Sequence, residues 1–328
     1  MNLATHAGLI AGTSVLAIAG TGTAGDLDSV IDGIINDSAT ISGDDAFSMS
    51  GLFAYGFVNE DSENYAGGIG SAHLTFEGHS GGWNWMFNYV LDGNTGYYGT
   101  DGADEIRDYA VWQEMDNGLS FGFGNVKGIF LKANGVGEAD TLQINNTNTG
   151  AALEGRGEQI GVKYEADQFR VMARLYDGAD EFSMDARVEF LAMGSWDDCN
   201  CFGSSAGSES TLLVGFSTSD EDNFDGTSFD VTYKADALAV HAAMTDAFDG
   251  AWEATTIQAS YFFADATMAY VSYEDVESTG PAGDFDDLDV GINHYFSDSC
   301  KGTLEIDFEN DAGADDDMTI SGQVQFTF

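Results

Sequence analysis

Positively charged side chains are few in this chain and are concentrated in one region. The chain has 10 Lys and Arg against 56 Asp and Glu, which gives a formal net charge of -46. Most of these cations fall within one stretch, where they are Lys127, Lys132, Arg156, Lys163, Arg170, Arg174 and Arg187. In so acidic a chain, a local concentration of positive charge would attract and orient anionic groups.

Carboxylates lie in the same stretch. Asp185 and Glu189 alternate with Arg187, so a strand would place all three on one face, and Glu138, Asp140 and Glu154 lie in the segment before it. Opposed charges that face each other across a narrow passage set up a transverse field, which filters solutes. The alternative interpretation is structural, in that the cations only offset neighbouring carboxylates.

Catalytic motifs are scarce. The chain contains neither His-Glu-x-x-His nor a glycine-rich phosphate loop, and its histidines are scattered at His6, His73, His79, His241 and His294. We therefore expect no enzymatic activity. The alternative is a lipase at a membrane rim, which would need a Ser and a His exposed together.

The N-terminus resembles an export signal. An apolar core at Leu9 to Ala19 is followed by small residues, which predicts a signal peptide at residues 1–24 with cleavage after Ala24. Its first residues contain no Lys or Arg, so an incorrectly assigned start codon is the alternative. Residues 25–44 then carry apolar side chains at helical spacing and predict a short periplasmic amphipathic helix and linker; this helix would pair with copies of itself, plug the rest of the fold or be only loosely held.

Export would place the three cysteines in an oxidising compartment. Cys199-Asn200-Cys201 is too tight and too isolated for a zinc site, and we predict that Cys300 pairs with Cys199 or Cys201. The sequence predicts no cofactor. Calcium binding by acidic loops such as Asp220 to Asn223 and Asp315 to Asp317 is possible in principle, although solvated loop charge is the simpler interpretation.

Composition and periodicity predict that strands carry most of these residues. With 42 glycines, one proline and 12% aromatic residues, the composition is typical of an all-β protein. After the N-terminus, no apolar run reaches the length of about 18 residues that a membrane-spanning helix needs. From Phe47 onward the period is two, and one face of the first strand carries Phe47, Met49, Gly51, Phe53, Tyr55 and Phe57.

The same alternation predicts sixteen strands, at 47–58, 67–77, 82–92, 106–115, 118–124, 158–165, 169–176, 182–196, 211–219, 227–234, 238–246, 253–263, 266–274, 285–296, 300–309 and 317–328. An even number of strands with one apolar face favours a closed antiparallel transmembrane β-barrel over residues 45–328. The last strand ends on Phe328, which resembles the end that the barrel insertion machinery recognises.

Connections alternate between short turns, as at Ala264-Asp265, and longer acidic segments, as at 92–105. This is the asymmetry of outer-membrane barrels. The longest connection, residues 125–157, carries apolar Ile129, Phe130 and Leu131, and we predict that it folds inward as a pore loop and sets the narrowest point. The connection 197–210 is too long for its place and indicates either an unusual inner turn or an error in the strand count.

Several segments, taken in order, resemble the phosphate-selective porin O/P family, in particular its acidic members from planctomycete-type bacteria. They are DLDSVIDGIINDS at 26–38, GLSFGFGNVK at 118–127, VEFLAMGSWD at 188–197, DVGINHYF at 289–296 and QVQFTF at 323–328. The resemblance implies a sixteen-stranded barrel, often trimeric, with its third loop folded into the pore. Phosphate-selective members line the lumen with many cations, so we carry over channel function and not phosphate preference.

The sequence thus predicts an outer-membrane porin, a passive channel for small solutes or ions. Its expected partners are outer-membrane lipid, the insertion machinery and two further copies of itself, and not nucleic acid, which so negative a chain would repel. In that case Arg170 and Arg174 face the lumen, and replacing both with Glu should shift ion selectivity toward cations. The alternative is a structural or adhesive surface barrel without transport activity.

Overall fold

A computed structural model of the chain describes residues 46–60, 64–91, 105–144, 146–177, 182–204, 207–220, 225–280, 283–311 and 317–328. The predicted signal peptide (1–24) and the amphipathic helix and linker (25–44) lie outside the described residues. Most of the two acidic segments considered for calcium lies outside them as well.

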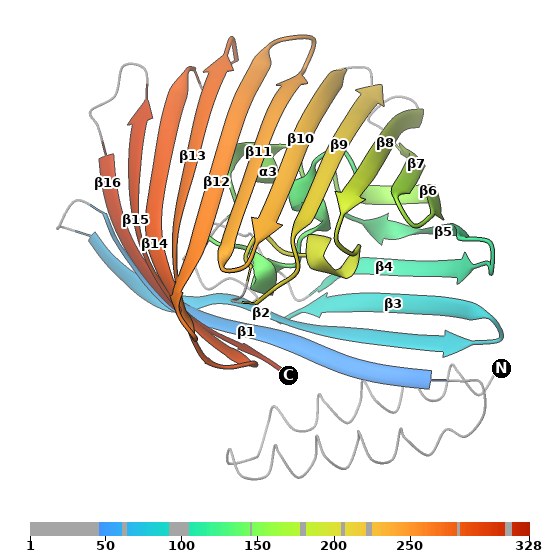
Figure 1. Cartoon of the computed structure of the whole chain (residues 1–328), viewed down its shortest axis with the longest axis horizontal. Coiled ribbons are helices and arrows are strands. Elements are labelled where there is room, and N and C mark those ends of the chain that lie inside the picture. Colours follow the sequence, from blue (N-terminus) through green and yellow to red (C-terminus); the bar gives the residue numbers. More distant parts are fainter. Residues whose placement is uncertain are drawn as a thin grey trace.

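The described residues form a closed antiparallel barrel in which each strand pairs with its neighbours in sequence and β1 closes the ring against β16 (Figure 1). This confirms the predicted fold class and the number of strands. The strands are β1 Ala46–Glu60, β2 Asn64–Ser80, β3 Trp83–Val90, β4 Glu105–Glu114, β5 Leu119–Val126, β6 Gly157–Glu165, β7 Phe169–Asp177, β8 Phe182–Met193, β9 Thr211–Asp220, β10 Gly226–Ala235, β11 Leu238–Ala247, β12 Trp252–Ala264, β13 Thr267–Ser278, β14 Phe285–Ser297, β15 Cys300–Asp311 and β16 Asp317–Thr327.

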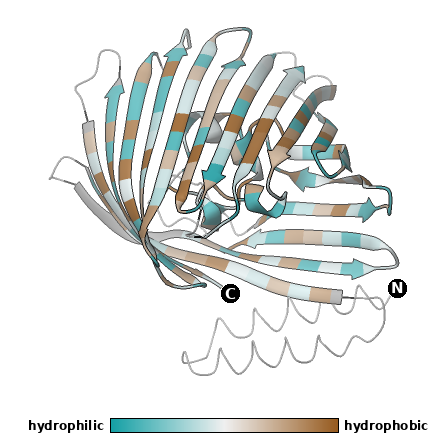
Figure 2. Ribbon diagram, in the orientation of Figure 1, coloured by the Kyte–Doolittle hydropathy of each residue, from teal (hydrophilic) through white to brown (hydrophobic). Residues whose placement is uncertain are grey.

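The two faces of the strands differ as the period of two predicts. On β6, Ile160, Val162 and Tyr164 are exposed on the outer face, whereas on β8 the polar Asp185 and Arg187 are buried on the inner face. Figure 2 shows the resulting alternation of hydrophobic and hydrophilic bands along the strands. Among the described residues, no helix combines the length and the apolar character needed to cross a bilayer.

The structure changes several predicted element boundaries. β2 begins at Asn64 and β13 ends at Ser278, each several residues beyond the predicted bound. The connections between β1 and β2 and between β13 and β14 are therefore shorter than predicted. The tight turn between β2 and β3 consists of Gly81 and Gly82, whose φ angles of 60° and 83° suit glycine. β8 ends at Met193, so the long connection before β9 is an unusual inner turn and not an error in the strand count.

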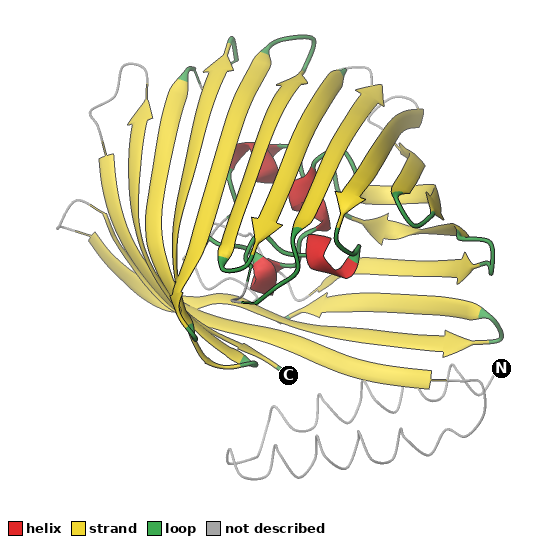
Figure 3. Cartoon of the chain, viewed as in Figure 1, coloured by secondary structure: helices red, strands yellow, loops and turns green. Residues whose placement is uncertain are grey.

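Among the residues that the structure describes, four short helices lie within the ring of strands (Figure 3). Three of them, η1 Lys132–Gly135, η2 Glu138–Asp140 and α3 Asn148–Ala152, belong to residues 127–156, which we call the inner loop. The fourth, η3 Asp197–Cys199, belongs to residues 194–210, which we call the turn-side segment. Side chains from the inner face of the barrel contact both, so both segments fold inward.

The predicted disulfide is wrong, because Cys199, Cys201 and Cys300 are all free thiols. Cys199 is buried beside Leu191 and Leu213 on β8 and β9, whereas Cys300 begins β15. In the strand order of the ring, these positions are separated by β10 to β14.

Candidate functional site

The inner loop is held to the barrel wall first by apolar contacts. Phe130 and Leu131 pack with Leu153 of the same loop and with Ala247 and Trp252 at the facing ends of β11 and β12. Phe130 is only 2% exposed. These are the apolar residues for which the sequence predicted packing on the inner wall, where exposure to water would be unfavourable.

Wall side chains also donate hydrogen bonds to carbonyl oxygens of the inner loop. The hydroxyl of Ser217 donates to the Phe130 carbonyl at 2.5 Å. Lys301 Nζ on β15 donates to the carbonyl of Ala139 at 2.9 Å and to that of Thr141 at 3.1 Å. A buried carbonyl without a partner is costly, so these donors fix the path of the loop.

At other positions of the inner wall, the direction of donation reverses. The backbone N–H groups of Ile144 and Thr149 donate to the carboxylates of Glu305 and Glu274 at 3.2 Å. The side-chain amide of Gln143 donates to Asp289. The strands β13 to β15 therefore offer a row of carboxylate acceptors to the polypeptide backbone and amides of the loop.

Several predicted site residues lie in the seam between the inner loop and β7 to β10, where they are buried. Arg174 pairs with Asp185 at 2.6 Å, and their side chains are 3% and 1% exposed. Arg187 pairs with Glu189 at 3.0 Å and with Asp230 at 2.8 Å. These side chains lie on the inner face of the barrel, where each is buried and paired with an opposite charge.

Lys132 of η1 lies in the same seam and is 7% exposed. Burial lowers the pKa of Lys132, and the nearby Arg187 lowers it further, while Glu189 and Asp230 oppose the shift. The loop cation thus adds to the charge network of the seam.

Arg170 and Lys163, two further predicted cations, lie close to the short turn between β6 and β7. Both pair with Glu165, at 2.8 Å for Arg170 and 3.5 Å for Lys163. The Arg170 guanidinium also stacks 4.2 Å above the ring of Trp196 in the turn-side segment. Lys163 is the more accessible of the two, with a side chain that is 41% exposed.

A second group of charges joins the inner loop to the opposite part of the wall. Glu138 of η2 lies 3.6 Å from Arg107 on β4 and 3.9 Å from His73 on β2. The Glu138 and Arg107 side chains are 32% and 30% exposed, so this contact is accessible to solvent. A loop carboxylate here contacts the guanidinium of Arg107 and lies beside the ring of His73.

The ends of the inner loop complete this group, which we call the loop-to-wall charge cluster: Glu138, Glu154, Lys127, Arg156, His73, Arg107 and Asp108. Arg156 pairs with Asp108 and with Glu154, and Lys127 lies 3.6 Å from Glu154. Burial and the neighbouring Arg107 lower the pKa of Arg156 to about 10. The cluster is thus a compact set of alternating charges at the point where the loop leaves and rejoins the barrel.

Asp140, the remaining predicted acid, ends η2, where part of it is exposed to solvent and part is covered. Burial raises the pKa of its carboxyl, and Lys301 and Lys234 act in the opposite direction.

Sequence reasoning missed Arg107, Lys234 and Lys301 because it followed the cations concentrated after the inner loop. Side chains alternate between the two faces of a strand, and this rule could have placed Lys234 and Lys301 on the inner face. For Arg107 the rule fails, because a bulge in the pairing of β3 with β4 interrupts the alternation.

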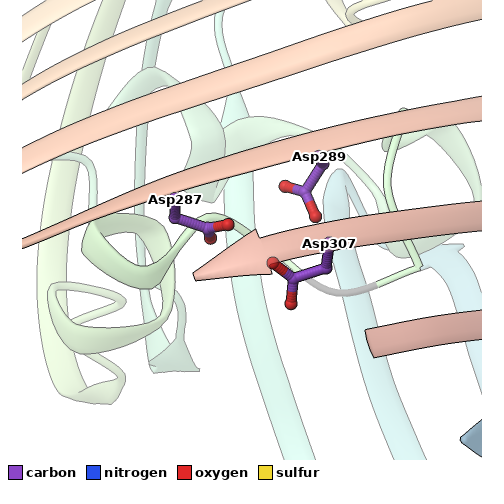
Figure 4. Close-up of side chains that lie close together, drawn as sticks. All are labelled: Asp287, Asp289 and Asp307. Carbon is purple, nitrogen blue, oxygen red and sulfur yellow. The ribbon is translucent and has the colours of Figure 1, made fainter. Parts of the chain in front are cut away.

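Three carboxylates on the inner wall converge behind the loop (Figure 4). Asp287 and Asp289 on β14 and Asp307 on β15 present oxygens within 4.8 Å of one another. Oxygens of this kind are ligands for hard cations such as calcium, so these are the side chains with metal-like spacing among the described residues. The Gln143 and Asn148 amides of the inner loop donate to Asp289 and Asp287, which ties this group to the loop.

One motif of hydrolases does occur, since residues 78–82 read Gly-His-Ser-Gly-Gly, a Gly-x-Ser-x-Gly sequence. In hydrolases this motif forms a strained turn between a strand and a helix. Here it ends β2 and makes the hairpin turn to β3, and the ring nitrogen of His79 is hydrogen-bonded to Asn84 at 2.9 Å. The structural context of a hydrolase nucleophile is therefore lacking at Ser80.

No protein-family model matches the chain, and no curated protein matches it in sequence. Solved structures are similar in fold. A loop-deletion variant of OmpT, an outer membrane protein of Vibrio cholerae, is 14% identical with a TM-score of 0.62, covering 87% of this chain and 100% of its own. OmpF of Salmonella typhi is 10% identical with a TM-score of 0.63, covering 87% of this chain and 98% of its own. An anion-selective porin from Comamonas acidovorans is 10% identical with a TM-score of 0.61, covering 87% and 100%.

Proposed function

We propose that this chain is an outer-membrane porin that forms a passive diffusion channel for small hydrophilic solutes or ions. The observation that carries the proposal is the inner loop, which is fixed inside a sixteen-stranded barrel and turns Glu138 toward Arg107 and His73. Opposed charges on a loop and a facing wall are the arrangement by which a channel filters solutes according to charge. The constriction is thus formed by the loop-to-wall charge cluster.

The bacterial outer membrane is the location that fits this surface. Exposed apolar side chains cover the outer faces of neighbouring strands, among them Ile160, Leu175, Val188, Phe216 and Ile257. Closed barrels with an apolar outer band and a polar interior are the β-structures that cross bilayers. One similar structure, OmpT of Vibrio cholerae, is described in a trimer form, and we propose a homotrimer for this chain as well.

Phosphate selectivity is not favoured, although the sequence segments resemble the phosphate-selective porin O/P family. Arg174, Arg187 and Arg170 are each paired with a carboxylate, and the first two are buried. The carboxylate partners largely neutralise the charge of these arginines, so little positive charge is left to attract a phosphate in the lumen. With a formal net charge of -46, we propose a channel that prefers cations.

Planar-bilayer recording of the purified protein tests the proposal. A channel gives discrete single-channel steps, and in a KCl gradient a cation-preferring channel has a reversal potential displaced toward the potassium equilibrium potential. A folded barrel that inserts into the bilayer but passes no current would contradict the channel and favour a structural or adhesive barrel. A reversal potential of the opposite sign would contradict the cation preference alone.

A further inference from the structure

The turn-side segment differs from the other connections at its end of the barrel. β12 and β13 are joined by Asp265-Ala266, and β14 and β15 by Asp298-Ser299, whereas the segment between β8 and β9 runs from Gly194 to Ser210. It folds inward along the wall. Cys199, 1% exposed, covers Leu191 and Leu213, which point into the barrel from β8 and β9.

Polar contacts on both sides of residue 202 pin this segment to the inner wall. Before it, Lys234 Nζ on β10 donates to the Asp198 carbonyl at 2.6 Å and contacts Cys201 Sγ at 3.1 Å. After it, the Ser204 hydroxyl donates to the carbonyl of Asp236, in the turn after β10, at 2.6 Å. The segment is therefore fixed on either side of Phe202.

Phe202 reaches the inner loop from the opposite end of the barrel. Its side chain, 4% exposed, packs with Val136 and Leu142 of the inner loop and with Met268 and Tyr270 on β13. Its ring also lies 4.6 Å from the ring of His241 on β11. The two inward-folded segments thus share one apolar core inside the barrel.

We propose that the turn-side segment is a second element of the pore, and that Phe202 is a positioning residue that holds the inner loop in place from the turn-side end. This inference rests on the proposed channel function. The inner loop is then held by two sets of contacts. One set is with the wall along β8 to β15, and the other is with Phe202 of the turn-side segment. The segment sets the width of the constriction without itself belonging to the loop-to-wall charge cluster.

Phe202→Ala tests this in planar bilayers. Removing the ring frees Val136 and Leu142, so we expect single-channel conductance to rise by about 1.5-fold, with greater open-channel noise. Phe202→Leu, which keeps an apolar contact, should restore the parent values. When residues 133–152 are replaced with a short Gly-Ser link, Phe202→Ala should change nothing, because its partners on the inner loop are gone.

A matched control is Phe216→Ala, which removes the same side chain from the outer face of β9, where it is 51% exposed. Each variant is first shown to be a folded, heat-modifiable barrel. A Phe202→Ala channel equal to the parent would overturn the proposal. An equal change in the parent and loop-replaced channels would also overturn it, because the effect would then not pass through the inner loop.

A second measurement does not depend on conductance and separates this inference from the proposed function. Lys132 is 7% exposed in the inner loop, and trypsin cleaves after lysine. In detergent, the folded Phe202→Ala barrel should be cleaved after Lys132 faster than the parent or the Phe216→Ala control. If the parent does not conduct, the channel proposal fails. If cleavage is also unchanged, the positioning role of Phe202 fails as well.

Discussion

The backbone N–H of Thr149 on the inner loop donates to both carboxylate oxygens of Glu274 on β13, at 3.2 Å each. Both residues are buried, with exposures of 3% and 2%. Glu274 also accepts a hydrogen bond from the hydroxyl of Thr256 on β12. One wall carboxylate therefore accepts the hydrogen bond of a backbone N–H at the start of α3 and links α3 to β12 and β13.

Glu274→Ala should loosen the inner loop, because it leaves a buried N–H without an acceptor at a cost of about 1 to 3 kcal/mol. We expect a lower midpoint of urea-induced unfolding and more open-channel noise. Glu277→Ala is the control, since Glu277 is exposed on the same strand. Equal midpoints and equal noise in the two variants would show that Glu274 does not anchor the loop.

Arg107→Glu should shift the reversal potential further toward that of a cation-selective channel, because it places a second carboxylate beside Glu138 at an accessible contact. Glu138→Gln should shift it in the opposite direction, since it removes the negative charge from the loop. Measurements in a KCl gradient compare both variants with the parent. Shifts of the same sign in the two variants would contradict a charge filter at this contact.

Replacing residues 133–152 with a short Gly-Ser link should raise single-channel conductance. The replacement removes η2, α3 and most of η1, and with them the hydrogen bonds of Ala139, Ile144 and Thr149 to β13 and β15. Phe130 and Leu131 are kept. The variant must first run as a folded, heat-modifiable barrel. A folded variant with the conductance of the parent would show that the inner loop does not set the narrowest point.

Arg174→Glu should reduce the yield of folded barrel, because it places a carboxylate against the buried Asp185 and leaves that charge without its cation, at a cost of about 3 to 5 kcal/mol. Combining it with Asp185→Arg should recover part of the yield. Arg170→Glu alone should fold better, because the Arg170 side chain is 16% exposed. The fraction of heat-modifiable protein measures all three, and equal yields for the two single variants would contradict a structural role specific to Arg174.

Lys132→Met should change the pH dependence of stability. Because burial lowers the pKa of Lys132, the unfolded chain binds this proton more tightly than the folded barrel. Stability should therefore rise with pH between the lowered pKa and the ordinary value of 10.5. Unfolding midpoints across this range should show a smaller rise for Lys132→Met than for the accessible Lys163→Met, and identical slopes would contradict the prediction.

The number of strands and their order around the barrel could be predicted from the alternation of side chains along the chain. Alternating side chains such as Phe53 and Tyr55 reveal the outer face of β1, and short turns such as Ala264-Asp265 separate later strands, because both signals depend on residues close together in the chain. The inward path of residues 127–156 could also be predicted. Its apolar residues needed burial, and the barrel interior offered it.

Which groups meet inside the barrel depends on the tertiary structure. Closure of the ring brings Glu138 to Arg107 and Lys301 to Ala139, and it places Phe202 against Leu142. It also separates Cys199 from Cys300. Strand parity states only that a side chain points inward. Whether the side chain then lines open space or is buried under another segment depends on how the two inward segments pack, which is a property of contacts between residues far apart in sequence.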